Sequence, residues 1–359
     1  MKKKRVNILL TNKLHHNHCS FCFIYPLILF RNELRESGFD FEFHYKFSND
    51  LENCDCILVD SAFYGKKWIN NKDEIKKQLF NLKKNKKIIY VDNQDNSGLI
   101  KSELLDIVDY YWKGQTLKNK SDYKKKHYGG RTFTDFYYRE NKIIDKKPIW
   151  SDVVKNNSDL NKIKTSWNMG YCNYGLFGHF FQRSFSLSKL SLFIRYPDDF
   201  SKNKHNKLKD FSCRIGTEYN RETISYQRQK IFALLKQKTK LKKIFRYFYL
   251  KEMRDSKVCI SPFGWAELCP RDFEAFMSGS ILLKPNMDTF DTWPNWYQNN
   301  KTYIPFNWNL SNLIEKLEYT IDNFDSLIDI ARTAQKNYYS YLCKNSGPEK
   351  FVSKFKKLI

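Results

Sequence analysis

The chain has 359 residues, of which 41% are hydrophobic, 17% aromatic and 28% charged. This length suits two domains of ordinary size, and the apolar content excludes a chain that is disordered by composition. The formal net charge of +24 is compatible with a polyanionic partner, an anionic membrane surface or a small anionic substrate, and equally with a general preference for lysine at surface positions.

The N-terminal stretch and the cysteines indicate the compartment. Residues 5–11, "RVNILLT", are too short for the apolar region of a signal peptide and predict a first strand. The longest apolar stretch, residues 19–30, falls short of the ~20 residues that a spanning helix needs. Nine cysteines, an odd number without a repeated spacing, favour buried free thiols. We therefore expect a cytoplasmic protein, at most peripheral at the inner membrane face.

The segment "HHNHCSFC" gathers five residues of types that bind zinc: His15, His16, His18, Cys19 and Cys22. A structural zinc site needs two ligand pairs separated by a loop, and no second cluster with matching spacing follows. We expect these residues in a loop after the first strand, with a helix starting near Pro26.

Strand and helix patterns then alternate over the first hundred residues. The predicted strands are 5–11, 40–47, 54–61 and 86–93, and the predicted helices are 25–39 and 71–85. Such alternation predicts an open, mostly parallel sheet with helices on both faces, which is a Rossmann-like unit.

Two carboxylates follow the last of these strands. Asp92 and Asp95 lie in "VDNQDNSG", at the carboxyl edge of the predicted sheet, where open α/β sheets bind ligands. Either could contact a substrate hydroxyl or act as a general base, and Asp95 is our first choice. The alternative is that Asp, Asn and Gly merely build the turn.

Residues 110–190 interleave basic and aromatic side chains. This pattern is found in proteins that bind single-stranded nucleic acid, but no known nucleic-acid-binding motif accompanies it. We expect loops and short helices that line a cleft between two domains, and no nucleic-acid partner.

A second set of strand and helix patterns begins near residue 190. Strands are predicted at 190–196 and 210–217 and a helix at 223–237. Residues 240–253 follow, with Leu241, Ile244, Phe245 and Phe248 at helical spacing among basic residues. Such a stripe can lie on an anionic membrane surface, and it also suits a helix that packs on its own sheet, which is our expectation.

The most informative stretch is "SKVCISPFGWAELCPRDFEAFMSGSILLKP", residues 256–285. It predicts a buried strand, a loop, a short helix from Pro270 to Gly279 and another buried strand. The helix amino end would then lie at the carboxyl edge of the sheet, where free N–H groups hold phosphates. Arg271 adds a donor fork for phosphate.

Two glutamates flank this helix start. Glu274 is placed to accept hydrogen bonds from vicinal hydroxyls such as those of a ribose, and Glu267 should face the same cleft from the far side of the phosphates. The alternative is that Glu267 and Asp272 only complement the helix dipole while Glu274 is solvated.

Residues 261–294 resemble the donor-binding segment of GT-B glycosyltransferases, above all of bacterial family-1-type and exostosin-like transferases. Their "PR..EA...G" core matches Pro270, Arg271, Glu274, Ala275 and Gly279. The resemblance implies an α/β fold with two Rossmann-like domains that face each other across a cleft. It also implies that Glu274 holds the nucleotide ribose and that Glu267, a catalytic candidate beside Asp95, contacts the donor sugar.

Residues 211–231 resemble the first strand, glycine loop and arginine-bearing helix of a donor domain. This resemblance implies four candidates for contacts with the diphosphate: Arg214, Gly216, Thr217 and Arg228. Two further donor-binding candidates, Ser261 and Gly264, lie in "SKVCISPFG" at 256–264. The implied domains are 1–188 for the acceptor and 189–340 for the donor. Residues 341–359 would form a C-terminal helix that packs back on the first domain.

The resemblance implies transfer of a sugar from a nucleotide-diphosphate sugar to a hydroxyl of a glycan or lipid-linked acceptor. The resemblance also implies no cofactor beyond the donor and no bound metal, because the helix dipole and basic side chains stabilise the leaving diphosphate. Consistent with this, "PDD" at 197–199 is better explained as a turn than as a D-x-D motif. Two alternatives are a nucleotide-sugar epimerase of the same fold and a basic nucleic-acid-binding protein.

Overall fold

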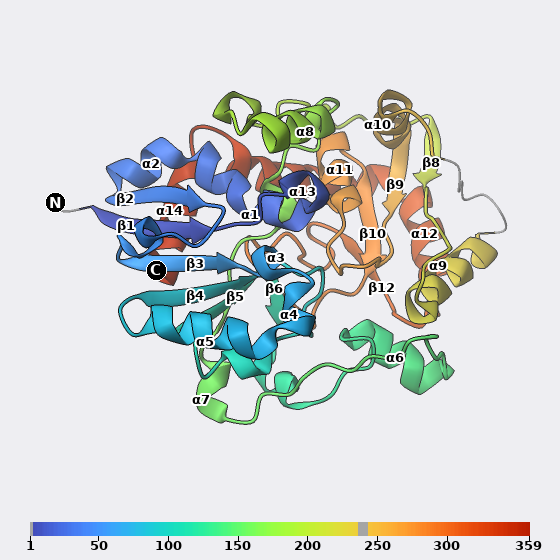
Figure 1. Cartoon of the computed structure of the whole chain (residues 1–359). Helices are drawn as coiled ribbons and strands as arrows, with labels where there is room; N and C mark the ends of the chain where they lie inside the picture. Colours follow the sequence, from blue (N-terminus) through green and yellow to red (C-terminus); the bar gives the residue numbers. More distant parts are fainter. Residues whose placement is uncertain (1–2, 236–242) are drawn as a thin grey trace.

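The computed structural model describes residues 3–235 and 243–359. It contains two parallel sheets, each of which defines a lobe (Figure 1). The N-terminal lobe has the strand order β2-β1-β3-β4-β5-β7, and the C-terminal lobe has the order β12-β10-β9-β8. The expected architecture of two Rossmann-like units is therefore confirmed.

The strands of the N-terminal lobe are β1 (Lys4–Leu9), β2 (Phe39–His44), β3 (Cys56–Asp60), β4 (Lys87–Asp92), β5 (Tyr110–Lys113) and β7 (Ile163–Thr165). All of their pairings are parallel. Every residue of β3 is buried, as expected for a parallel strand covered on both faces, so its apolar run does not alternate.

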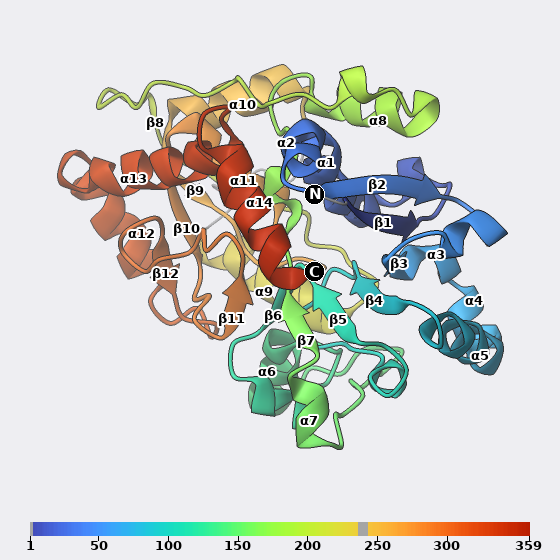
Figure 2. The same cartoon turned by 90° about the vertical axis from the view of Figure 1, so that its left-hand side faces the viewer.

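Helices cover both faces of this sheet (Figures 1 and 2). One face carries α1 (His18–Leu29), α2 (Arg31–Glu36) and the C-terminal α14 (Gly347–Leu358), and the other carries α3 (Ser61–Tyr64), α4 (Lys67–Asn70) and α5 (Lys72–Lys83). The short helix α7 (Asn157–Leu160) precedes β7.

The strands of the C-terminal lobe are β8 (Lys209–Ser212), β9 (Ser256–Ile260), β10 (Ile281–Pro285) and β12 (Ile304–Phe306). Its helices are α9 (Glu222–Leu234), α10 (Arg246–Asp255), α11 (Pro270–Ser278), α12 (Leu313–Asp322) and α13 (Phe324–Leu342). Among the described helices, none is both long and apolar enough to cross a bilayer.

The two lobes are joined by more than the chain connection. Strand β6 (Gln115–Leu117) pairs antiparallel with β11 (Phe290–Thr292), so a small two-stranded sheet links them. Helix α6 (Thr132–Asn141), from the first half of the sequence, lies against α9, where Gln227 Nε2 donates to Tyr137 Oη. These contacts limit how far the lobes can move apart.

The C-terminal helix returns to the N-terminal lobe (Figure 2). The ring of Phe355 lies 5.1 Å from that of Phe39 and 5.2 Å from that of Phe41, and Phe351 lies 5.0 Å from Trp167. Phe351 and Phe355 are fully buried. An aromatic cluster therefore holds α14 on the first sheet.

Four local expectations are wrong. The first helix starts at His18, not near Pro26, because Asn17 Oδ1 caps the N–H of Ser20 at 3.0 Å, so the His and Cys residues from His18 to Cys22 lie on a helix. Residues 110–190 contain β5, β6 and β7, whose three or four residues are too few to show periodicity.

The third error concerns residues 190–196, which form no strand. Ser191–Phe193 is a 3₁₀ turn after α8 (Gly178–Ser188), and Leu190 and Leu192 lie on the surface. The predicted helix at 240–253 begins only at Arg246, and Leu241 lies outside the described residues. Phe245 and Phe248 do not pack on the sheet but are exposed.

We expect Phe355→Ala to lower the free energy of unfolding by about 3–5 kcal/mol, because it removes a buried ring from the aromatic cluster under α14. Urea unfolding followed by tryptophan fluorescence measures the loss. The neighbouring exposed Lys356→Ala serves as the control and should stay within about 0.5 kcal/mol of the wild type. Equal stabilities of the two variants would contradict the assigned packing of α14.

Candidate active site

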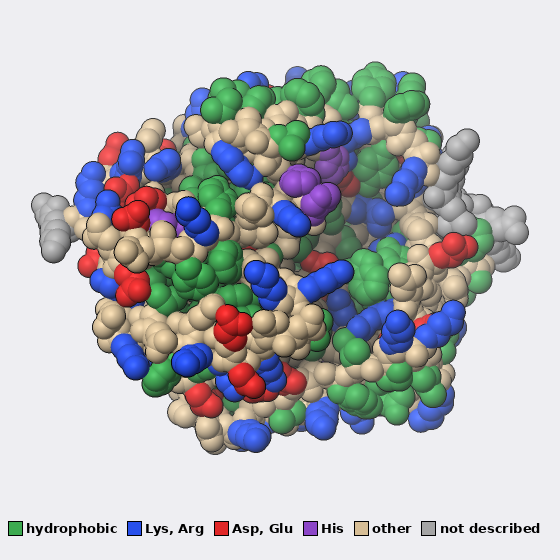
Figure 3. All heavy atoms as spheres, in the orientation of Figure 1, with side chains coloured by type: hydrophobic (Ala, Val, Ile, Leu, Met, Phe, Trp, Pro, Cys, Tyr) green, Lys and Arg blue, Asp and Glu red, His purple; other side chains and the backbone are tan. Residues whose placement is uncertain are grey.

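A cavity of about 860 Å³ lies between the lobes, within the ~300–1,000 Å³ of typical ligand sites. We call it the interlobe cavity. Its N-terminal wall includes His18, Cys19, Asp95, Met169 and His179, and its C-terminal wall includes Arg214, Gly216, Arg228, Gly264, Arg271 and Glu274. Figure 3 shows the surface hollowed between the lobes. The loops that follow β4, β8 and β9 all reach it, so the carboxyl edges of both sheets face the same space.

Helix α11 presents its first turn to this cavity. Pro270 occupies the first helical position, as predicted, and Gly279 ends the helix at φ 65°, where glycine adopts the left-handed conformation without strain. Cys269 and Asp272 form a reciprocal capping box. The predicted order of strand, loop, helix and strand is confirmed.

Asp272 fixes the amino end of α11 to the sheet. Its carboxylate, fully buried, accepts hydrogen bonds from Ser261 Oγ at 2.5 Å and Tyr297 Oη at 2.6 Å, and pairs with Lys284 Nζ at 3.0 Å. Ser261 follows β9 and Lys284 lies in β10, so the pair holds the helix between these strands. Ser261 is therefore an anchor of α11 and does not line the cavity, contrary to its expected contact with a ligand.

Three arginines lie on the C-terminal wall. Arg271 Nη2 donates to the carbonyl of Arg214, and its buried Nε has no hydrogen-bond partner among the described residues. Arg228 Nε donates to the carbonyl of Phe263 at 2.8 Å and Nη1 to that of Gly216 at 3.3 Å. The guanidinium of Arg214 pairs with the carboxylate of Glu252, and its Nη2 donates to Oε2 at 2.7 Å. Arg271 therefore lines the cavity with a guanidinium that its partners among the described residues do not fully engage.

Two glycines of this wall lie beside Arg228. A Cβ at Gly264 would lie 3.0 Å from Nη2 of Arg228, so a larger residue would displace the guanidinium. Gly216 lines the cavity and its carbonyl orients Arg228. Thr217, predicted beside it, is not among the cavity residues.

Glu274 lies in the cavity wall and is 5% exposed, so it is not the solvated residue of the alternative interpretation. Oε1 accepts from Arg246 Nη1 at 2.8 Å and Oε2 from Tyr249 Oη at 2.8 Å. A carboxylate has about four acceptor positions, so it can still accept bonds from a ligand hydroxyl. Arg246 and Tyr249 come from α10, which therefore orients Glu274.

The placement of Glu267 contradicts the expectation that it faces the cleft. The residue is fully buried and lines neither the interlobe cavity nor the smaller pocket beside it. Its carboxylate accepts from Ser97 Oγ at 2.8 Å and Gln115 Nε2 at 2.7 Å, both in the first half of the chain. Burial raises the pKa of Glu267, while the nearby Arg131 cation acts in the opposite direction. Glu267 ties the loop before α11 to the N-terminal lobe.

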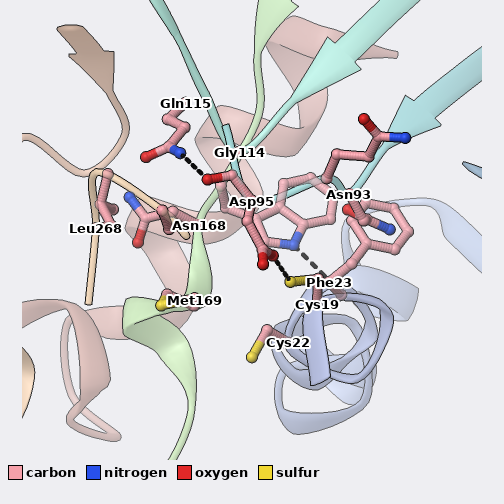
Figure 4. Close-up of a pocket in the computed structure, with 13 residues that line it drawn as sticks. Cys19, Cys22, Phe23, Asn93, Asp95, Gly114, Gln115, Asn168, Met169 and Leu268 are labelled. Carbon is pink, nitrogen blue, oxygen red and sulfur yellow. Dashed lines mark hydrogen bonds between the residues drawn. The ribbon is translucent and has the colours of Figure 1, made fainter. Parts of the chain in front are cut away.

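Asp95 faces the cavity from the opposite wall. Figure 4 shows the smaller pocket next to it, where the Sγ of Cys19 donates to Asp95 Oδ1 at 2.6 Å. Gln115 Nε2 donates to the backbone carbonyl of Asp95 at 3.2 Å, which holds the turn in place. Asp95 is partly exposed and lines both cavities, so it is accessible to a bound molecule.

Asp92, the other candidate base, is a buried structural residue. It pairs with Lys113 Nζ at 2.9 Å and accepts from Tyr111 Oη at 2.6 Å, and both Asp92 and Lys113 are 1% exposed. Burial alone would raise the pKa of Asp92, but the cations of Lys113 and Lys101 outweigh it and lower that pKa to about 2. Asp92 does not reach the cavity.

Sequence reasoning missed the partners of these residues. Arg246 and Tyr249 orient Glu274, Cys19 orients Asp95, and Arg131 lies near Glu267. The apolar spacing at 240–253 predicts a packing helix and gives no indication that its polar residues orient Glu274. The spacing around Cys19 suggests a zinc ligand and not a partner of Asp95. Within the described residues, no group of three or more His, Cys, Asp and Glu side chains is arranged to hold a metal ion.

The sequence matches no protein-family model and no curated protein. Several solved structures are similar over nearly the whole chain. An alpha-glucosyltransferase in complex with UDP and a 13-mer DNA has 11% identity and a TM-score of 0.46, covering 99% of this chain and 100% of that one.

A glycosyltransferase from Rickettsia africae has 12% identity and a TM-score of 0.44, covering 100% of this chain and 99% of that one. Anabaena HepE, in complex with UDP-glucose, has 8% identity and a TM-score of 0.44, covering 99% and 100%. At such identities the function of this chain has to be argued from its own cavity.

We expect Asp92→Asn to lower the free energy of unfolding by about 3–5 kcal/mol at pH 7, because it leaves the Lys113 cation buried without a counter-charge. The folded-state pKa is depressed, so the carboxylate stabilises the fold above pH ~5 and loses this effect as the pH falls towards ~2. Urea unfolding of wild type and variant should therefore show that the difference between their free energies of unfolding becomes smaller as the pH falls through this range.

The matched control for this measurement is Asp73→Asn, because the side chain of Asp73 is fully exposed. It should change stability by no more than about 0.5 kcal/mol at any pH. If the difference in free energy of unfolding between wild type and Asp92→Asn did not depend on pH, the paired, ionised state of Asp92 would be contradicted.

Proposed function

We propose that this chain is a glycosyltransferase that moves a sugar from a nucleotide-diphosphate sugar to a hydroxyl of a glycan or lipid-linked acceptor. The observation that carries the proposal is the arrangement of the interlobe cavity. The amino end of α11 and the guanidinium groups of Arg228 and Arg271 lie on one wall, and the carboxylate of Asp95 lies on the other. A hexosyl donor and the synthesis of a surface polysaccharide or other glycan are the substrate and role that we infer.

The C-terminal wall suits the donor. A diphosphate carries negative charge that increases as the bond to the sugar breaks, and N–H groups at a helix start together with guanidinium groups stabilise such charge. The guanidinium of Arg271 lines the cavity and supplies a charge-assisted donor for a phosphate oxygen. Glu274, fixed by Arg246 and Tyr249, would accept the vicinal hydroxyls of the ribose. These cations supply the charge that a metal ion would otherwise supply, so we propose a metal-independent reaction.

The N-terminal wall suits the acceptor. In the proposed step the acceptor oxygen forms a bond to the anomeric carbon while the bond from that carbon to the diphosphate oxygen breaks. The acceptor proton passes to Asp95, which acts as the general base. The thiol of Cys19 holds one carboxylate oxygen of Asp95 and leaves the other available for this proton.

We expect Arg271→Ala to weaken binding of the nucleotide-diphosphate sugar by about 10- to 100-fold, because a charge-assisted hydrogen bond is lost. Glu274→Gln, which keeps the shape but removes the charge, should weaken it in the same direction. Thermal shift against a panel of nucleotide sugars measures this, since a ligand at 100 times its dissociation constant adds about 2.7 kcal/mol of stability.

The control for donor binding is Arg332→Ala, because Arg332 is exposed and its guanidinium contacts Asp329 and His205, outside the interlobe cavity. This variant should bind the donor like the wild type. Full donor affinity in both Arg271→Ala and Glu274→Gln would refute the assignment of the donor site.

We expect Asp95→Asn to lower the turnover number by about 10²- to 10⁴-fold while donor affinity changes less than about threefold, because the general base is lost and the donor wall is intact. Product formation from a labelled donor and an acceptor panel, with and without a chelator, gives the rate, and thermal shift gives the affinity.

Two outcomes of these assays would point to the alternative functions. Conversion of the donor sugar without any acceptor would identify an epimerase. Binding of DNA or RNA with a steep salt dependence, and without any response to nucleotide sugars, would identify a nucleic-acid-binding protein.

A further inference from the structure

An exposed apolar surface lies beside the interlobe cavity and plays no part in the proposed reaction. Around α8 the exposed residues are Phe177, which precedes the helix, Phe180 and Leu187 on it, and Leu190 and Leu192 after it. At the start of α10 they are Phe245, Tyr247 and Phe248. These eight side chains are between 52% and 83% exposed, and we call them the α8–α10 surface. Figure 3 shows hydrophobic side chains gathered along the upper edge, over α8 and α10.

The two helices form one continuous surface. Arg246 Nε, on α10, donates to the carbonyl of Gly175 at 3.2 Å, which joins α10 to the segment before α8. A groove of about 430 Å³ lies between them, with Phe177 and Phe181 on one side and Tyr247 and Leu250 on the other. Both Figures 1 and 2 show α8 and α10 on the same side of the molecule.

The charges around this surface are mostly positive. Residues 176–196 contain no Asp or Glu and carry Arg183, Lys189 and Arg195. Lys251 is exposed on α10. Of the acids near the groove, Asp199 is paired with Arg254, while Asp198 is exposed. Large apolar side chains with a basic rim are the composition of surfaces that dock on anionic lipid.

Other partners fit these residues less well. Single-stranded nucleic acid is bound by stacking on aromatic rings, but the three exposed leucines offer bases no stacking partner. In a twofold symmetric dimer both copies would bring the same basic rim to the interface, and residues 176–196 offer no acid to pair with it. An anionic bilayer accepts both features, because phosphate groups meet the basic rim and the hydrocarbon boundary accommodates leucines and phenylalanines.

We propose that the α8–α10 surface docks the protein on the surface of an anionic phospholipid membrane. Leucines and phenylalanines insert at the boundary between headgroups and acyl chains, and Arg183, Lys189 and Arg195 lie among the phosphates. His179 of α8 and Arg246 of α10 flank the interlobe cavity, so docking holds the cavity opening close to the membrane.

The test is sedimentation of the full-length chain with vesicles of phosphatidylcholine alone or with about one third phosphatidylglycerol. We expect binding to the anionic vesicles, at least about 10-fold weaker binding to the neutral ones, and release at high salt. The combined variant Phe180→Ser, Leu187→Ser and Phe248→Ser should lose at least about 10-fold in affinity for the anionic vesicles.

The matched control replaces exposed apolar residues on another face, Ile69→Ser and Phe80→Ser, and should bind like the wild type. Unchanged melting temperatures show that each variant is folded, as expected for exposed positions. Binding needs neither donor nor turnover, so this test and those of the proposed function can fail independently.

Three results would overturn the proposal. One is an absence of vesicle binding by the wild type, and another is equal binding by the surface variant. The third is that the substitutions instead abolish a dimer seen by sedimentation velocity or the binding of an oligonucleotide. Either of those losses would assign the surface to a second copy or to nucleic acid.

Discussion

The buried pair of Asp272 and Lys284 is the interaction on which the interlobe cavity depends. Both side chains are fully buried, and the carboxylate also accepts bonds from Ser261 and Tyr297. Removing two charges from water costs several kcal/mol per ion, so such a pair is a weak source of stability. Its effect here is positional, because Ser261 follows β9 and Lys284 lies in β10, so the carboxylate of Asp272 fixes the start of α11 at both strands. That placement directs the first turn of α11 into the space between the lobes.

The acidic residues around the cavity fall into two groups, those enclosed in the protein and those that line the cavity. Asp92, Glu267 and Asp272 are buried and hold structure together, each through at least two hydrogen bonds or ion pairs. Asp95 and Glu274 reach the cavity and keep acceptor capacity. Acidic residues thus provide both the frame of the cavity and its polar groups, and the difference is whether the side chain lines the cavity or is enclosed away from it.

Several contacts between the lobes restrict the opening of the interlobe cavity. The β6–β11 pair, the packing of α6 on α9 and the return of α14 all cross between them. Glu267 adds a buried link between the loop before α11 and the N-terminal lobe. Any opening of the cavity must therefore break or bend these links, whereas α8 and α10 lie at its outer edge with exposed apolar side chains.

Some features followed from the sequence alone because they are local. The alternation of strand and helix patterns predicts the parallel sheets, and Pro270 and Gly279 predict the two ends of α11. Arg271 and Glu274 could be placed in a cavity wall because a helix start at the end of a buried strand has one usual position in a parallel sheet. Strands of three or four residues, such as β7, gave no readable period.

Only the tertiary structure decided which polar residues are accessible and which are enclosed. Nothing in the spacing of Glu267 and Glu274 shows that one is buried against Ser97 and Gln115 while the other lines the cavity. Nor does the sequence show that Asp92 is buried while Asp95, three positions later, lines the cavity. It also does not show that apolar residues of α8 and α10 are exposed. Burial depends on segments far apart in the chain, here 170 residues for Ser97 and Glu267, and such contacts leave no periodic pattern in the sequence.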